Sequence, residues 1–247
     1  MDVKSGSGVD HGTVMRIEAE IEGVLLERVN RFLSVVDADL NGRRERLKVH
    51  VHDPGRLEEI LYPGNRVLLR EAAGGNRKTS FDLIAGRVGG RWVLVNSMFH
   101  SDIAASLLAG GGKNPFPGYC LVKREVKVGG SRFDMLLRSD EDEMLVEIKG
   151  CTLTEGGTAL FPDAVTARGA RHVLELASLA REKMSTAVLF LVLGPPATQL
   201  MANRATDPAF ADAILSALDS GVSIRAVRMG YEPPLLLYEG SIPVVGI

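Results

Sequence analysis

The sequence predicts two domains of different class, a small all-β domain followed by an α/β domain. Three observations support this. At 247 residues the chain is about twice the commonest domain length. Its first part carries short apolar segments between turn residues, whereas the later part alternates between helical and strand-like patterns. We therefore predict a flexible tail at residues 1–12, a β-barrel at 13–96 and a mixed sheet flanked by helices at 97–247.

The first domain is predicted from strands that alternate with turns. Residues 24–28 and 32–36 flank a turn at Asn30, and residues 47–51 alternate apolar and polar side chains, which turns one face inward. Further strands are expected at residues 67–70, 81–85 and 92–96. This density of short strands favours a small closed or half-closed barrel. Such barrels are often oligonucleotide/oligosaccharide-binding (OB) folds, but the pattern alone does not distinguish that topology from other small barrels.

The second domain is predicted from its order of elements. A helix at residues 103–109 precedes strands at 121–128 and 132–138, which meet at the glycine pair 129–130. The remaining elements are a strand, a helix, a strand, a helix and a strand at 144–149, 166–182, 187–193, 207–220 and 222–227. This order predicts a mixed sheet with helices on its faces.

Composition narrows the class of protein. Apolar residues make up 45% of the chain and charged residues 24%, with a mean hydropathy of +0.08, so we expect a packed core rather than disorder. No apolar run approaches the roughly 20 residues that span a bilayer, and the start lacks the apolar segment of a secretory signal. Cys120 and Cys151 are too few for a disulfide framework or a Cys-rich zinc site. We expect a cytoplasmic protein with no membrane segment.

Charge favours a nucleic-acid partner only locally. The formal net charge is −2, so the molecule is not basic as a whole. Residues 28–48 hold six basic and three acidic residues, which predicts a local positive strip. A solvated strand edge protected by charge explains the same residues equally well. The side chains expected to contact a DNA backbone here are those of Arg43, Arg44, Arg46, Lys48 and Arg56.

Acidic side chains within the apolar strands of the second domain mark a candidate site. Asp134 lies within one strand, and Glu147 and Lys149 share a face of the next, two residues apart. Buried carboxylates need a compensating charge, which Mg²⁺ or Mn²⁺ supplies. We therefore predict that Asp134, Glu147 and the Ile148 carbonyl ligate the metal. Glu125, one strand earlier, is expected to ligate through water or orient a ligand, and Lys149 to orient or deprotonate a nucleophile.

This spacing is that of a PD-(D/E)xK nuclease site, an acid followed about a dozen residues later by Glu-x-Lys on the next strand. The alternative is a salt-bridged sheet in which Lys149 only neutralises Glu147 or Asp134. Arg168 and His172, four residues apart on one predicted helix face, are expected to face a phosphate near the helix N-terminus. Surface pairing with Glu175 or with solvent is the alternative for both.

Several sequence blocks together carry a resemblance to a known family. They are residues 54–57 (PGRL), 95–97 (VNS), 131–134 (SRFD), 146–153 (VEIKGCTL) and 161–169 (FPDAVTARG). These blocks resemble the sugar fermentation stimulation protein family (SfsA). The resemblance implies an N-terminal OB fold, a PD-(D/E)xK nuclease-like domain, DNA binding and a role in regulating sugar (maltose) metabolism. It also implies that the acidic and lysine positions of the site are Glu125, Asp134, Glu147 and Lys149. The chain departs from the family at Asp53 and Ser97.

Two functions follow from these observations. The first is a DNA-binding regulator with a nuclease-like, Mg²⁺-dependent site. The alternative is an active metal-dependent DNA phosphodiesterase. A carbohydrate-binding OB module has less support, because aromatic residues total 5% and Trp92 is the single tryptophan. The same scarcity weakens single-strand binding by base stacking, so we expect contact with a duplex backbone, largely without sequence specificity. Whether the protein forms a homodimer is left open.

Overall fold

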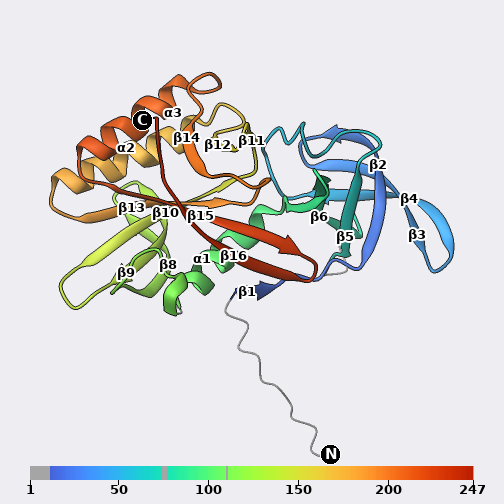
Figure 1. Cartoon of the computed structure of the whole chain (residues 1–247), viewed down its shortest axis with the longest axis horizontal. Coiled ribbons are helices and arrows are strands. Elements are labelled where there is room, and N and C mark those ends of the chain that lie inside the picture. The colour runs from blue at the N-terminus through green and yellow to red at the C-terminus, as the bar shows by residue number, and fades with distance from the viewer. Residues whose placement is uncertain (1–11, 74–76, 110, 247) are drawn as a thin grey trace, which may run out of the picture.

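The computed structural model describes residues 12–73, 77–109 and 111–246, which form two units packed side by side (Figure 1). Apart from Gly12, the predicted flexible tail at residues 1–12 lies outside the described residues. No helix in the described part of the chain is both long enough and apolar enough to pass through a bilayer.

The first unit is a barrel of strands that each bury alternate side chains. Its strands are β2 (Ile21–Asn30), β3 (Leu33–Leu40), β4 (Arg43–Val51), β5 (Arg66–Glu71) and β6 (Phe81–Val88). They pair in the order β2–β3–β4–β6–β5, and β5 pairs back onto β2, which closes the barrel. Leu25, Val36 and Val49 are fully buried inside it, so alternate residues of each strand supply the core, as the period of two predicts.

The second unit is a mixed sheet with helices on both faces. Its main elements are α1 (His100–Leu108), β8 (Cys120–Val128), β9 (Ser131–Arg138), β10 (Glu143–Cys151), α2 (Ala167–Arg181), β13 (Ser185–Val192), α3 (Pro208–Asp219) and β15 (Ser223–Glu232). Strands β8, β9 and β10 run antiparallel, whereas β10, β13 and β15 run parallel. Leu107 of α1 belongs to the core on one face, and Leu176 of α2 and Phe210 of α3 belong to the core on the other.

Capping residues explain where the two long helices begin. The Thr166 hydroxyl accepts the Gly169 N–H (3.1 Å) at the start of α2. At the start of α3, Asp207 accepts the Phe210 N–H (3.0 Å), just before the favourable first-turn proline Pro208. The second oxygen of Asp207 accepts the Thr166 N–H (2.8 Å), so one carboxylate fixes both helix starts.

Several elements lie outside the predicted ones. They are the 3-10 turns η1 (Ser97–Phe99) and η2 (Gly111–Lys113), and the strands β1 (Thr13–Arg16), β11 (Thr154–Glu155), β12 (Thr158–Phe161), β14 (Gln199–Ala202) and β16 (Leu235–Ile242). Strands β11, β12 and β14 form a small second sheet. β1 falls within the segment assigned to the barrel, but its partner strand is β16 of the second unit.

One strand joins the two units. β7 (Arg91–Leu94) pairs with β6 of the barrel and also with β15 of the second unit, where Trp92 lies opposite Tyr231. The main sheet therefore continues from the barrel into the second unit without a break in hydrogen bonding.

Candidate functional site

The carboxylates of Asp134 and Glu147 come together where β9 separates from β10. The last paired residues of these strands are Met135 and Val146. Just beyond this pair, Asp134 Oδ2 accepts the N–H of Ile148 (2.6 Å), so a side chain takes the place of a strand partner. This bond holds the Asp134 carboxylate against the segment that carries Glu147.

Glu147 is enclosed, with 4% of its surface exposed. Its Oε1 accepts from Lys149 Nζ (2.6 Å) and lies 2.8 Å from His172 Nδ1 on α2. Its Oε2 is also buried, yet it has no hydrogen-bond partner among the described residues. Burial, and then the charge of Glu147, raises the pKa of Asp134. The pair thus concentrates negative charge in a place that water reaches poorly.

A hard divalent cation fits these residues. An unpartnered buried carboxylate oxygen costs free energy, and a cation between Glu147 and Asp134 would satisfy it. In the described part of the chain, no three His, Cys, Asp or Glu side chains are grouped so as to hold a metal ion by themselves. The fit is therefore to an ion such as Mg²⁺, which takes one or two carboxylates and fills its other positions with water, backbone or phosphate oxygens.

Glu125 is not brought to this pair. It lies on β8 with a left-handed backbone (φ 54°), its side chain is 70% exposed, and its carboxylate lies 3.8 Å from Arg132. The structure therefore places Asp134, Glu147 and Lys149 together and leaves Glu125 in solvent.

The structure separates the two residues predicted to face a phosphate from α2. Arg168 is exposed in the first turn of the helix. His172 is only 4% exposed, and its ring lies between Glu147 and Phe133. The helix face that carries the His172 ring packs on the sheet, so this ring lies beneath the surface, whereas the prediction places it against a phosphate. Because its Nδ1 contacts the Glu147 carboxylate, His172 is positioned to orient that side chain.

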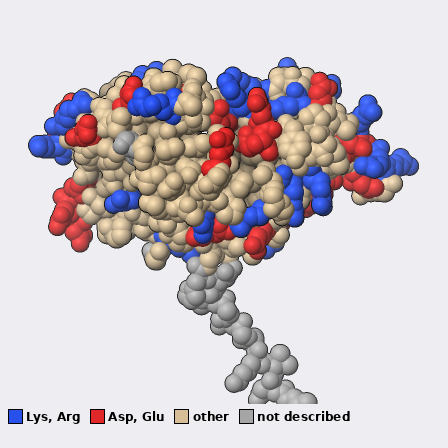
Figure 2. Space-filling view, turned by 45° about the horizontal axis from the view of Figure 1, so that its top comes forward, with Lys and Arg blue, Asp and Glu red and all other residues tan. Residues whose placement is uncertain are grey.

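Acidic residues of the neighbouring strand face part of the predicted positive strip. Arg43, Arg44, Arg46 and Lys48 are exposed on β4, but β3 sets Asp37 and Asp39 opposite Arg46 and Arg44. Arg44 lies 3.1 Å from Asp37. Figure 2 shows basic and acidic side chains mixed at the right-hand end of the molecule, which the β3–β4 hairpin forms. Asp37 and Asp39 are among the three acids counted in residues 28–48, but a count does not show that strand pairing sets them opposite the arginines.

A loop of the barrel reaches the candidate site. Asp163, in the connection before α2, accepts the backbone N–H groups of Arg56 (2.8 Å) and Leu57 (3.3 Å). A cleft of about 380 Å³ lies between the units at this point. Its lining includes Arg31 and Asp53 from the barrel and His100, Ile148, Lys149 and Asp163 from the second unit. The candidate cation site therefore adjoins a cleft that both units build.

Three of these residues, Asp53, His100 and Asp163, have no role among the predictions made from the sequence. Burial, and then the charge of Lys149, lowers the pKa of His100 to about 4, so its ring is neutral at pH 7. Burial, and then the nearby Asp163, raises the pKa of Asp53 to about 6. The signal that could have found them is their position in or beside the sequence blocks at 54–57, 95–97 and 161–169.

The raised pKa of Asp53 predicts a pH-dependent stability. The folded state binds this proton more tightly than the unfolded chain, so stability falls as the pH rises from about 4 through about 6. Asp53→Asn should therefore stabilise the protein at pH 7.5, by at most about 3 kcal/mol, and have little effect at pH 3.5. Urea midpoints at both pH values test this, with the exposed Asp140→Asn as control. An equal effect at the two pH values would contradict it.

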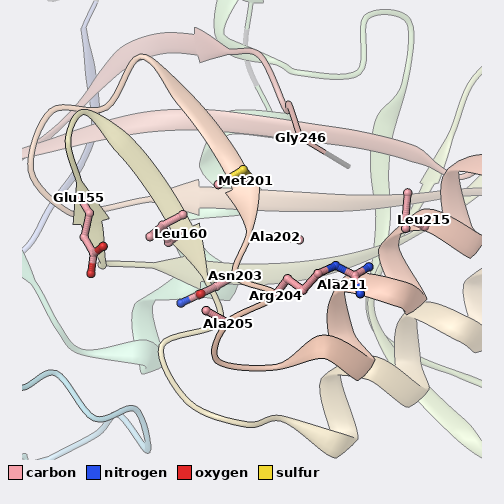
Figure 3. A pocket seen from close by; sticks show the side chains of 10 residues that line it. All are labelled: Glu155, Leu160, Met201, Ala202, Asn203, Arg204, Ala205, Ala211, Leu215 and Gly246. Atoms are coloured by element: carbon pink, nitrogen blue, oxygen red, sulfur yellow. The ribbon is translucent and has the colours of Figure 1, made fainter.

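A second cavity, of about 480 Å³, lies between β12, β14 and α3 (Figure 3). Leu160, Met201 and Leu215 line it, and of the residues labelled in Figure 3 only Glu155 and Arg204 are charged. None of its lining residues belongs to the predicted site, so it has no evident part in the chemistry of the acid pair.

Comparison with known proteins agrees with the two-unit architecture. Residues 98–234 match the family described as "Sugar fermentation stimulation protein RE domain", and residues 26–95 match the "SfsA N-terminal OB domain". The predicted family and the predicted fold class, an OB-fold-like barrel followed by a nuclease-like mixed sheet with helices, are confirmed.

Individual relatives cover nearly the whole chain. A "Sugar fermentation stimulation protein homolog" of Methanothermobacter thermautotrophicus is 49% identical over 210 residues, 85% of this chain and 86% of that protein. A protein of the same description from Methanococcoides burtonii is 43% identical over 238 residues, 96% of each chain. A solved structure, that of Pyrococcus furiosus SfsA in complex with Ca²⁺, has a TM-score of 0.86 and 28% identity, and the match covers 95% of this chain and 99% of that one.

Proposed function

Because the chain belongs to the sugar fermentation stimulation protein family, we propose that it is a DNA-binding protein that holds Mg²⁺ or Mn²⁺ at a nuclease-like site and acts in the cytoplasm in the regulation of sugar metabolism. The observation that carries the cation is the buried, unpartnered Oε2 of Glu147 beside Asp134. The relative of known structure supports it, since that protein is described in complex with Ca²⁺. The link to sugar metabolism rests on the family description.

The residues that would hold the cation are Asp134 and Glu147, with the Ile148 carbonyl as a backbone ligand. A divalent ion at this place supplies positive charge to a phosphate oxygen of DNA. Lys149 is held by Glu147 on the wall of the cleft, where its ammonium group adds a second positive charge for the same phosphate. His172, whose Nδ1 lies 2.8 Å from the same Oε1 that Lys149 contacts, would help to orient the Glu147 carboxylate.

Two exposed arginines beside the cleft are proposed to contact the DNA backbone. Arg56 belongs to the barrel loop that Asp163 holds, and Arg168 lies in the first turn of α2, next to the cleft residue Thr166. Phosphates bind favourably at a helix N-terminus, where backbone N–H groups and the helix dipole add to the arginine charge. The hairpin arginines Arg44 and Arg46, which face acidic residues, are expected to add less.

Fluorescence anisotropy with a labelled duplex, measured over a range of salt concentrations with Mg²⁺ present, tests the proposal. The parent is expected to bind with a steep salt dependence, and Arg168→Ala should weaken binding and reduce the salt slope by about one. Arg181→Ala, at the other end of the same helix, is the matched control and should bind as the parent does. No duplex binding at low salt would overturn the proposal.

The same samples, incubated with Mg²⁺ or Mn²⁺ and run on a denaturing gel, separate binding from cleavage. Intact DNA with the parent, Asp134→Asn and Lys149→Gln supports a binding protein. If the parent cleaves the DNA and both substitutions abolish cleavage, the protein is a metal-dependent phosphodiesterase and the proposal of a binding regulator is refuted.

A further inference from the structure

We propose that the outer face of the barrel binds single-stranded nucleic acid, with a base stacked on Phe32 and phosphates held by Lys48, Arg77 and Lys78. This inference rests on the proposed function, because it takes DNA as the ligand. It deepens that function by naming a DNA with an unpaired segment as the preferred substrate class.

The site is a groove of about 710 Å³, which is larger than the cleft and the second cavity described above. Its lining comes from the β2–β3 turn, from β4 and the residue that follows it, and from residues 77–79 before β6: Asn30, Phe32, Leu33, Lys48, His50, His52, Arg77, Lys78 and Thr79. In the pairing order of this barrel, β3 and β4 are the second and third strands, and these turns are the first and the last connection. In OB folds this combination of strands and loops forms the ligand face.

The groove offers an aromatic surface. Phe32 is 50% exposed although its side chain is apolar. Its ring is nearly parallel to that of His50, at 19° and 6.4 Å between centroids, and His50 rests edge-on against His52 at 4.2 Å. Burial, and then His52 and Arg77, lowers the pKa of His50, so its ring is uncharged at pH 7. The low aromatic content of the whole chain hides this local pair, which can accept the face of a base.

The groove is also lined by basic side chains, of which Arg77 forms an ion pair with Asp82. Lys48 and Lys78 are exposed on its wall, and none of the described residues that line it is acidic. The guanidinium group of Arg77 donates a hydrogen bond to the carboxylate of Asp82. Asp82 is 4% exposed, and its carboxylate also lies 2.9 Å from His52 Nε2. The two lysines contrast with the arginines of the hairpin tip, which carboxylates face. Stacking surface and cations together fit a polyanion with accessible base faces, which a single strand has and an intact duplex lacks.

The groove is adjacent to the cleft beside the cation site. In the β2–β3 turn, Asn30 and Phe32 line the groove while Arg31, between them, lines the cleft. In the segment after β4, His52 lines the groove and Asp53 the cleft. A single-stranded nucleic acid bound in the groove could thus continue over the β2–β3 turn or the segment after β4 into the cleft that Lys149 lines.

Anisotropy with a fluorescein-labelled oligothymidylate of about 15 nucleotides tests the proposal, with a blunt hairpin duplex measured in parallel. Phe32→Ala should weaken oligothymidylate binding about 5- to 100-fold and leave duplex binding unchanged. Tyr62→Ala removes an aromatic ring of similar exposure (47%) outside the groove and should have no effect. Phe32→Trp should retain affinity, and its added tryptophan fluorescence should be quenched when the oligonucleotide binds.

The outcomes distinguish this proposal from the previous one. Equal oligothymidylate affinity for the parent and Phe32→Ala, or no quenching in a folded Phe32→Trp that binds the oligonucleotide, would overturn the single-strand site even if the duplex binds. Failure of the parent to bind oligothymidylate at low salt would also overturn it. Single-strand binding that depends on Phe32, without any duplex binding, would support this site and refute the duplex-binding part of the proposed function.

Discussion

The Glu147→Gln variant is expected to lose divalent-cation binding. In the proposed site, the buried Oε2 of Glu147, which has no hydrogen-bond partner among the described residues, is the oxygen left to bind the cation, and the neutral amide removes the charge that attracts the ion. The loss should exceed the roughly 10- to 100-fold that follows when a residue supporting a metal ligand is removed. Isothermal titration with Mn²⁺ and with Ca²⁺ measures it.

Two further variants make this result specific. Glu125→Gln should bind the ions as the parent does, because that carboxylate is in solvent. His172→Gln, which alters only the support of Glu147, should fall between the parent and Glu147→Gln. Unchanged ion affinity in Glu147→Gln, or a greater loss in Glu125→Gln, would refute the assignment of the site.

The Gly194→Ala variant is expected to be the most destabilised of three glycine variants, by about 3 kcal/mol or more. A Cβ at this position would lie 2.1 Å from the backbone oxygen of Thr152, and a backbone atom cannot move aside as a side chain can. Relief requires that the segment after β10 separate from the segment after β13, next to the chain that carries Lys149. The midpoint of urea unfolding gives the stability, and ion titration shows whether the site is disturbed as well.

Alanine substitutions at two other glycines should destabilise the protein less than Gly194→Ala does. At Gly130 an added Cβ meets nothing within 4 Å, so Gly130→Ala should leave stability almost unchanged. At Gly150 the contact is with the side chain of His100 and not with backbone, so Gly150→Ala should cost less than Gly194→Ala. A Gly194→Ala protein as stable as Gly130→Ala would show that the close approach at Thr152 is not a constraint.

The local parts of this fold were predictable from the sequence because each has a local cause. The hairpin of β8 and β9 follows from its glycine pair, the starts of α2 and α3 from Thr166 and Asp207, and the barrel strands from alternation. The pairing of β1 with β16 joins the two ends of the described chain, and no pattern within either strand announces it. Strands that find partners across more than 200 residues are beyond such reasoning.

The candidate site likewise has features that the sequence predicts and features that it does not. The two-residue spacing of Glu147 and Lys149 fixes their common face, and the structure shows them in contact. The exposure of Glu125 depends on a left-handed residue within a strand, and the burial of His172 depends on which face of α2 meets the sheet. The contact of Asp163 with the backbone of Arg56 and Leu57 spans more than 100 residues and leaves no trace in spacing. The Asp163 contact arises from packing between the units, and the other two features arise within the second unit.

The strand β7, shared by the two units, limits how the protein can receive a ligand. β7 pairs with β6 over four residues and with β15 at Trp92 opposite Tyr231, and Asp163 accepts two backbone N–H groups of the barrel, so a swing of the barrel away from the second unit would break these contacts. A jaw-like closure around DNA is therefore costly. We expect that the nucleic acid does the adapting, by bending or unpairing to meet a rigid receptor, so flexible or nicked DNA should bind better than a stiff intact helix.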